Sequence, residues 1–198
     1  MSEKKNGYIY YEYKEQTEKE EIIKTAFSSF FHWMSGIISV LVLIFLVIML
    51  FFRPVTVDGP SMEPTLHDGD RLLIYSFMYT PVNGDIIVAR SPDGADMPVI
   101  KRVIAKAGQR VDIDYDSGTV YVDGVPLEEN YISGMTKVPV NEIKYPYTVP
   151  EGHLFVMGDY RDESRDSRHA TFGCIDENTV AGKAVYRFYP FSSMTEVK

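Results

Sequence analysis

The chain has 198 residues, of which 45% are hydrophobic and 24% are charged, and its formal net charge is −8 at pH 7. This length accommodates one domain of ordinary size with accessory segments, and the negative charge excludes a general electrostatic interaction with nucleic acid. The single cysteine, Cys174, excludes an internal disulfide bond and a cysteine cluster. We expect Cys174 to be an ordinary small apolar residue, although His169 lies five positions before it as a potential base.

The first predicted element is a membrane-spanning helix over residues 30–52. This stretch contains no Asp, Glu, Lys or Arg, and a helix of about 20 apolar residues crosses the hydrocarbon core of a membrane. A cleavable secretory signal is the alternative, but its apolar region is only about 7–15 residues long and is followed by a small-x-small site. No such site follows residue 52, and a buried core helix would have a polar face. The pattern therefore favours a retained anchor.

Charges on either side of this span predict its orientation. Five lysines occur in residues 1–29, whereas Arg53 and Arg71 are the basic residues shortly after the span. Basic residues near the ends of a span favour the cytoplasmic side. We therefore expect a single-pass cell-membrane protein with a cytoplasmic tail over residues 1–29 and an extracytoplasmic domain over residues 53–198. The tail is expected to be disordered or to form a short helix from about Glu15.

Residues 53–198 are predicted to form a mostly β domain. The expected strands cover residues 72–75, 85–90, 99–104, 111–115, 119–122, 153–157 and 183–189. Asp116-Ser117-Gly118 separates two of them and predicts a hairpin. Turns about every ten residues favour antiparallel sheets in a barrel-like fold. Helical structure is expected only over residues 176–179, with residues 75–79 as a further candidate.

Three segments of this domain could carry chemistry. In the first, around Ser61, nearby glycine and prolines constrain the path of the chain, which can expose the hydroxyl and direct backbone N–H groups to one point, as an oxyanion hole requires. Glu63 replaces the second glycine of a G-x-S-x-G elbow, so that hydrolase motif is excluded. The plain alternative is a turn with a solvated serine.

The second segment places two basic residues in an apolar strand. Lys101 shares a strand face with Val99 and Val103, while Arg102 points to the opposite face. One of the two is expected to face a buried environment, and burial lowers the pKa of a lysine so that the neutral amine can accept a proton from serine. A lysine on an edge strand is the alternative.

The third segment, residues 157–169, mixes charges of both signs densely. It is either a polar surface loop or a network that orients a site. Two other arrangements stay open at this point. Ser61 could pair with His67, His153 or His169 in a triad, and His153, Asp159, Asp166 and His169 could bind a metal, although their spacing matches no established ligand pattern.

These three segments together resemble the type I bacterial signal peptidases, in particular the one-span Gram-positive form. Ser61-Met62-Glu63-Pro64-Thr65-Leu66 is similar to the family motif S-M-x-P-T-L. Lys101-Arg102-Val103-Ile104-Ala105 with Gly108 is similar to K-R-V-x-A-x-x-G. Gly158-Asp159 and Ser164-x-Asp166-Ser167-Arg168 are similar to the last motif of the family. Their order behind one span matches as well, and the resemblance covers residues 30–190.

The resemblance implies a metal-free and cofactor-free serine endopeptidase that removes signal peptides from secreted preproteins after a small-x-small site such as Ala-x-Ala. It implies Ser61 as nucleophile and Lys101 as general base. Ser164 would hydrogen-bond the lysine amine, and a supporting network would comprise Arg102, Asp159, Asp166 and Arg168. Membrane lipid is an expected partner, and this location allows contact with the secretion translocase.

Two positions depart from the family pattern. Tyr160 replaces the asparagine of G-D-N, and Gly59 occupies a position where many Gram-negative members carry a serine that helps to bind the oxyanion. The oxyanion would then depend mainly on backbone N–H groups, including that of Ser61. Rival interpretations are a catalytically inactive membrane-anchored β binding module and a self-cleaving Ser-Lys regulator, although regulators of that kind usually lack a span.

Overall fold

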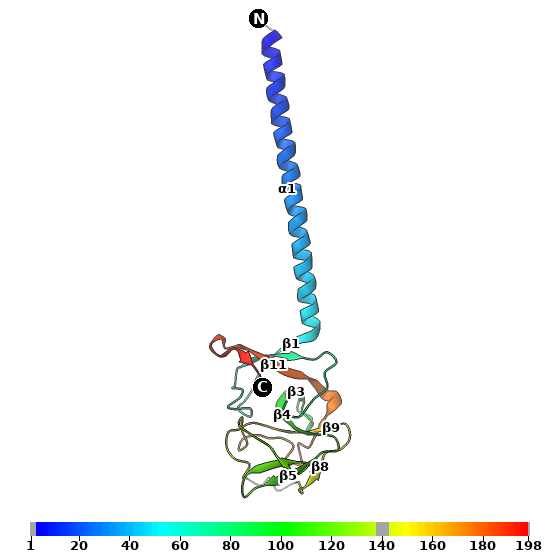
Figure 1. Ribbon diagram of the computed structural model, residues 1–198, viewed down its shortest axis with the longest axis vertical. Coiled ribbons are helices and arrows are strands. Elements are labelled where there is room, and N and C mark those ends of the chain that lie inside the picture. Colours follow the sequence, from blue (N-terminus) through cyan, green and yellow to red (C-terminus); the bar gives the residue numbers. More distant parts are fainter. Residues whose placement is uncertain (1–2, 138–142, 198) are drawn as a thin grey trace. The chain divides into compact units, whose positions relative to one another are not determined.

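The structure is a computed structural model that describes the backbone of residues 3–137 and 143–197 and the side chains from residue 18 onward. The chain divides into two compact units, residues 1–49 and residues 50–198. The first is almost entirely one helix, and the second is built from β-strands (Figure 1).

Helix α1 runs without interruption from Glu3 to Phe51. Residues 18–51 are long and apolar enough to cross a membrane, and none of the most apolar window is buried within the protein. The prediction that a helix would begin near Glu15 was wrong, because the helix already begins at Glu3. The added turns contain Glu and Lys, which favour helix, and they extend an existing helix rather than nucleating a new one.

In the part of the chain that the structure describes, twelve strands and two short 3-10 helices form the second unit. Their bounds are β1 Phe52–Thr56, β2 Arg71–Tyr75, β3 Ile86–Arg90, β4 Pro98–Lys106, β5 Arg110–Asp114, β6 Thr119–Val122, β7 Val125–Pro126, β8 Tyr147–Thr148, β9 His153–Met157, β10 Ile175–Asp176, η1 Glu177–Thr179, β11 Val180–Tyr189, η2 Phe191–Ser193 and β12 Thr195–Glu196. Every pairing between these strands is antiparallel. The predicted mostly β, antiparallel fold is therefore confirmed.

The strands form two sheets. The larger has the order β1-β2-β11-β3-β4-β9-β10, with β12 added to β11, and the smaller has the order β7-β6-β5-β8. In Figure 1, β1 and β11 lie at one end of this unit and β5 and β8 at the other. A core that includes Ile104, Val111, Val120 and Phe155 packs the smaller sheet against β4 and β9. Strand β4 therefore lies at the centre of the unit.

The predicted hairpin is confirmed, and its strands β5 and β6 pair from Val111↔Val122 to Asp114↔Thr119. The candidate helix at residues 75–79 was wrong, because Tyr75 ends β2 and a turn follows. Strand β1 was not predicted. A proline such as Pro54 cannot donate a hydrogen bond within a central strand, but β1 pairs only with β2 in the described part of the chain, and an edge strand tolerates proline.

Candidate active site

Ser61 lies in the loop between β1 and β2, and the loop's own hydrogen bonds fix its path. Val57 N–H donates to the Asp70 carbonyl at 2.8 Å, and Gly59 N–H donates to Asp68 Oδ1 at 2.9 Å. Gly59 has a φ of 89°, in the region that glycine adopts without strain. A serine in place of Gly59 would therefore be strained in this loop conformation.

The two backbone polar groups of Ser61 differ in their hydrogen bonding. Its carbonyl accepts a hydrogen bond from Tyr160 N–H at 3.1 Å. Its own N–H donates to no acceptor in residues 3–137 and 143–197. A fixed N–H without a protein acceptor, next to a serine hydroxyl, is the geometry that an oxyanion donor requires.

The Lys101 side chain reaches Ser61 from strand β4, and the Lys101 Nζ to Ser61 Oγ distance is 2.7 Å. Lys101 is only 5% exposed. Burial lowers the pKa of this amine to about 8; the nearby charges of Asp166 and Asp159 act in the opposite direction, and that of Arg168 adds to the lowering. The amine therefore loses its proton far more readily than an ordinary lysine.

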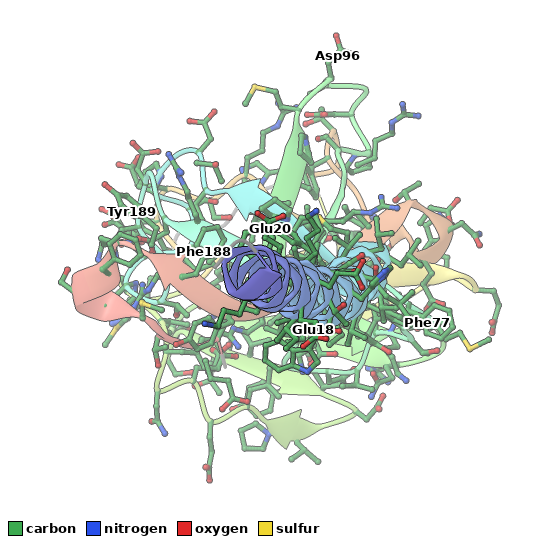
Figure 2. The ribbon with its side chains drawn as sticks, turned by 90° about the horizontal axis from the view of Figure 1, so that it is seen from above. Glu18, Glu20, Phe77, Asp96, Phe188 and Tyr189 are labelled. Carbon is green, nitrogen blue, oxygen red and sulfur yellow. The ribbon has the colours of Figure 1, made fainter. Side chains whose placement is uncertain are left out.

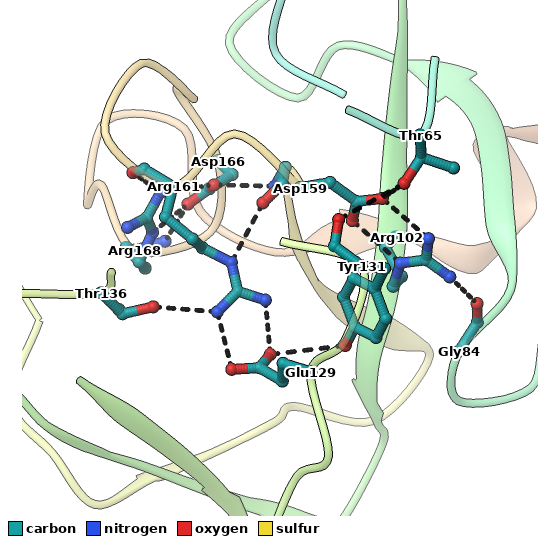
Figure 3. A network of polar contacts seen from close by, with 11 residues as sticks. Thr65, Gly84, Arg102, Glu129, Tyr131, Thr136, Asp159, Arg161, Asp166 and Arg168 are labelled. Atoms are coloured by element: carbon teal, nitrogen blue, oxygen red, sulfur yellow. Dashed lines mark hydrogen bonds and ion pairs between the residues drawn. The ribbon is translucent and has the colours of Figure 1, made fainter. Parts of the chain in front are cut away.

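Arg102, the next residue on β4, is also buried, so both basic residues face a buried environment rather than one of them. Its Nε and Nη2 donate to the two carboxylate oxygens of Asp159 at 2.9 and 2.7 Å, and its Nη1 donates to the Gly84 carbonyl at 2.8 Å. The guanidinium stacks on the Tyr131 ring, 3.9 Å from its centroid, and Thr65 Oγ1 donates to Asp159 at 2.6 Å. Figure 3 shows this fully paired arrangement.

Asp166 and Arg168 form a second buried pair. Arg168 Nε and Nη2 donate to the Asp166 carboxylate at 2.8 and 2.9 Å, and Gly158 N–H donates to the same carboxylate at 2.9 Å. Burial raises the pKa of Asp166, but the hydrogen bonds and charge of Arg168 outweigh it, and the pKa is lowered. The two acidic and two basic residues expected as a network thus form two separate ion pairs, Arg102–Asp159 and Arg168–Asp166.

Ser164 does not make its expected hydrogen bond to Lys101 in this structure. Its hydroxyl is buried and has no hydrogen-bond partner among the described residues. The hydroxyl packs directly over Gly158, where any Cβ would collide with it and with the Ser61 carbonyl. Gly158 therefore allows Ser164 and Ser61 to approach each other, while the lysine amine contacts Ser61 instead.

The alternative partners do not reach Ser61. Neither His67, His153 nor His169 forms a hydrogen bond with its hydroxyl in the described part of the chain. The Cys174 thiol contacts the Tyr147 hydroxyl at 3.7 Å, and burial raises its pKa, which makes it a poor nucleophile. No group of three potential metal ligands occurs among the described residues.

Four residues that the sequence analysis did not single out also enter the site's polar network. They are Glu129, Tyr131, Thr136 and Arg161. Arg161 lies in the charge-dense third segment, so the sequence indicated its neighbourhood but not its partners. The other three come from the connection between β7 and β8, which carried no recognisable motif.

A groove of about 580 Å³ opens beside Ser61 and Lys101, and it is lined by residues 55–58, 61–62, 68–69 and 97–101. Residues 98–101 pair with β3 on one side, whereas β9 begins to pair with β4 only at Arg102. Figure 2 shows Asp96, which precedes this strand, at the outer tip of the β3–β4 connection. An unpaired strand edge in a groove can accept an extended peptide.

A serine hydroxyl in contact with a buried lysine amine, beside a groove on a β domain, is the arrangement of hydrolases of the serine–lysine class. The family model "Signal peptidase, peptidase S26" matches residues 30–189, most of the chain. The chain therefore belongs to the S26 family of signal peptidases, which are hydrolases.

The sequences of two relatives agree with this assignment. Signal peptidase I of Bacillus licheniformis is 37% identical over 176 residues, which cover 84% of this chain and 92% of that protein. Signal peptidase IB of Staphylococcus aureus is 33% identical over 177 residues, which cover 81% of this chain and 90% of that protein. The crystal structure of a signal peptidase I from Enterococcus faecalis V583 aligns with a TM-score of 0.43 at 32% identity, covering 54% of this chain and 98% of that one.

Proposed function

We propose that this S26 peptidase removes signal peptides from exported preproteins with Ser61 as nucleophile and Lys101 as general base. Membership of the family establishes that the chain is a peptidase that acts on signal peptides. One observation above all others supports the roles of Ser61 and Lys101. The Lys101 amine lies 2.7 Å from the Ser61 hydroxyl and is buried, so it can be neutral near physiological pH.

The proposed reaction has two halves. Ser61 Oγ attacks the scissile carbonyl while its proton passes to the neutral Lys101 Nζ. The tetrahedral intermediate then collapses, the C–N bond breaks, and the lysine gives its proton to the departing amine. In the second half, water loses a proton to Lys101, attacks the acyl-enzyme, and releases the signal peptide as its carboxylate with Ser61 reprotonated.

The Ser61 N–H is the proposed donor to the oxyanion. It lies in a loop whose path is set by the Gly59–Asp68 hydrogen bond and by the Tyr160 contact to the Ser61 carbonyl. Removing one oxyanion donor in other serine proteases costs about 10²–10³ in rate. A pre-fixed backbone donor would compensate in part for the absence of a serine side chain at position 59.

The groove is the proposed site for the residues before the cleavage point. An extended substrate would add as a strand beside residues 97–101, and its alternate side chains would point into the groove. Met62 and Val99 line the groove, and their apolar surfaces suit small apolar side chains. This geometry supports a small-x-small specificity of the Ala-x-Ala kind.

Arg102–Asp159 and Asp166–Arg168 are proposed to support the dyad by fixing β4 and the segment after β9. Within the described part of the chain, neither Asp forms an ion pair with Lys101, and each pairs with an arginine instead. Ser164 is proposed as a hydroxyl near the dyad that supports its orientation, through packing on Gly158 in this structure. No cofactor is required for this chemistry.

We propose that residues 30–52 anchor the enzyme in the cell membrane, with residues 1–29 cytoplasmic and residues 53–198 outside. The length and hydropathy of α1 support one span, and the five lysines before it support this orientation. Anchoring confines the active site to the surface where the apolar part of a signal peptide lies, which raises its effective concentration. Contact with membrane lipid follows from the anchor, and contact with the secretion translocase is proposed from the location alone.

The test is cleavage of a preprotein bearing one Ala-x-Ala site by the purified full-length protein in detergent. The new N-terminus is sequenced, with Ser61→Ala and Lys101→Ala run in parallel. We expect cleavage directly after the site by the wild type and none by either variant. A folded wild type that binds the preprotein without cleaving it would instead support the inactive binding module.

A further inference from the structure

The connection between β7 and β8 contains a segment, residues 129–136, that lies against the chain following β9. We call it the bridging segment. It lies outside the three motifs on which the resemblance to signal peptidases rests, and the strands on either side of it in the chain belong to the smaller sheet. Two of its side chains, those of Glu129 and Thr136, nevertheless contact Arg161 (Figure 3). Arg161 follows Tyr160, the residue whose N–H donates to the Ser61 carbonyl.

The first set of contacts is a short ladder of backbone hydrogen bonds. Ser133 N–H donates to the Asp159 carbonyl at 2.9 Å, and Arg161 N–H donates to the Ser133 carbonyl at 3.0 Å. Ser133 and Tyr160 thereby form an isolated parallel β-bridge. Successive backbone groups of an extended chain point to opposite sides, and Tyr160 N–H accordingly points away from Ser133 and donates to the Ser61 carbonyl at 3.1 Å.

The second set of contacts fixes the Arg161 side chain. Its Nη1 donates to Glu129 Oε2 at 2.9 Å and to Thr136 Oγ1 at 2.8 Å, and its Nη2 also bonds to Glu129. Its Nε donates to the Gly158 carbonyl at 3.1 Å. Arg161 is 3% exposed and Thr136 is fully buried, so solvent does not replace these bonds.

The two sets of contacts act on the same three residues, 159–161. Asp159 binds Arg102 at one end of this short stretch, and Arg161 binds Glu129 and Thr136 at the other. The middle residue, Tyr160, is the one whose N–H contacts Ser61. A shift of this stretch would move the hydrogen bond that holds the Ser61 backbone, and with it the position of the hydroxyl relative to Lys101.

We propose that the bridging segment is a positioning element for Ser61, in which Glu129 and Thr136 hold Arg161 so that Tyr160 N–H fixes the nucleophile's carbonyl. This inference rests on the proposed role of Ser61 in peptide cleavage. Glu129, Thr136 and Arg161 do not touch the reacting atoms and are positioning residues. The identity of residue 160 is then free to vary, because its contribution is a backbone N–H, and this explains how tyrosine can replace the family's asparagine there.

The test compares Glu129→Gln with Glu128→Gln in the full-length protein, using kcat and KM for a preprotein with one Ala-x-Ala site. Glutamine keeps the shape of Glu129 but removes its charge, and Glu128 is an exposed neighbour. A displacement of about 1 Å at a catalytic group can cost about 10²-fold in rate. We expect Glu129→Gln to lower kcat by about 10–100-fold with KM almost unchanged, and Glu128→Gln to match the wild type.

A pH profile separates positioning from stability. If Ser61 moves and water reaches Lys101, the amine is better hydrated, and the rising limb of kcat/KM should move to higher pH in Glu129→Gln. Thermal unfolding is measured on the same samples. A Glu129→Gln enzyme with the kcat and pH profile of Glu128→Gln, even if it melts at a lower temperature, would overturn the inference.

A second pair of variants keeps the test decisive if Glu129→Gln fails to fold. Thr136→Val keeps the volume of the side chain but removes its hydrogen bond to Arg161, whereas Thr136→Ser retains the hydroxyl. We expect kcat to fall in Thr136→Val and to recover in Thr136→Ser, and equal kcat values would contradict the inference. Absence of cleavage by the wild type would instead overturn the proposed function, so the two failures are distinguishable.

Discussion

Lys101 and Arg102 are adjacent on β4, carry the same formal charge and are both almost fully buried, yet their surroundings differ completely. Arg102 donates to both oxygens of Asp159 and to the Gly84 carbonyl, and it stacks on Tyr131. Lys101 has Ser61 Oγ as its hydrogen-bond partner and no ion pair within the described part of the chain. The charge of Arg102 is therefore balanced by a bound carboxylate, whereas Lys101 hydrogen-bonds only to a neutral hydroxyl group among the described residues.

This difference gives Arg102 a structural role and leaves Lys101 available for proton transfer. A buried guanidinium and carboxylate that share two parallel hydrogen bonds hold each other in one geometry, as Arg102 and Asp159 do. A buried amine without a counter-ion lowers its pKa, as Lys101 does. The alternation of side chains across a strand therefore places a rigid anchor and a titratable base on consecutive residues.

The largest expected effect on catalysis comes from replacing Lys101 with arginine, the residue type next to it on β4. A guanidinium stays protonated at any physiological pH and cannot act as a base. We expect Lys101→Arg to lower kcat/KM by about 10²–10⁴-fold, the usual contribution of a general base. Lys106→Arg, near the end of the same strand, is the matched control in the cleavage assay. Comparable rates for the two variants would remove Lys101 from the mechanism.

The next largest effect, on stability, is expected when Arg102 loses its counter-ion and so has none, like Lys101. Asp159→Asn leaves the Arg102 charge buried without its counter-ion, which should lower the free energy of unfolding by about 3–5 kcal/mol. Arg165→Gln breaks the Arg165–Asp93 pair, in which the arginine is 58% exposed, and should cost less than about 1 kcal/mol. Denaturant unfolding of both variants measures the contrast. Equal losses would mean that burial does not distinguish the pairs.

The smallest effect is expected at Ser164. Because its hydroxyl has no hydrogen-bond partner among the described residues, Ser164→Ala removes no bond to Lys101. A typical hydrogen bond contributes about 0.5–1.5 kcal/mol, so we expect the rate of peptide cleavage to fall by less than about tenfold. A loss as large as that of Lys101→Arg would show that the hydroxyl binds the amine during the reaction.

The sequence indicated Ser61 and Lys101 because the relevant patterns are local. A lysine within an apolar strand and a serine among prolines and glycine are visible in a few consecutive residues, and the resemblance to signal peptidases then joined them. The hairpin of β5 and β6 was equally local, since alternating strands flank a turn. The sequence also indicated the apolar helix, although not how far α1 extends before residue 18.

The contacts that support the site could not be predicted in the same way. Glu129 and Arg161 are 32 residues apart in the chain, and no periodicity connects an acidic residue in an irregular connection with a basic residue in a polar loop. The pairing of β1 with β2 was hidden because the apolar span runs directly into Phe52 and Pro54 follows. Such features depend on tertiary packing, which decides which of many charged residues become buried.

The account depends most directly on the ionisation of Lys101. Titrating the side-chain ¹⁵N signal of this lysine in the full-length protein, with Lys101→Arg to assign it, measures that property without reference to any substrate. We predict a pKa of about 8, so the neutral amine, and with it kcat/KM, should increase as the pH rises through this value. A pKa near the ordinary lysine value of about 10.4 would contradict the account, because the proposed base would then be almost fully protonated at physiological pH.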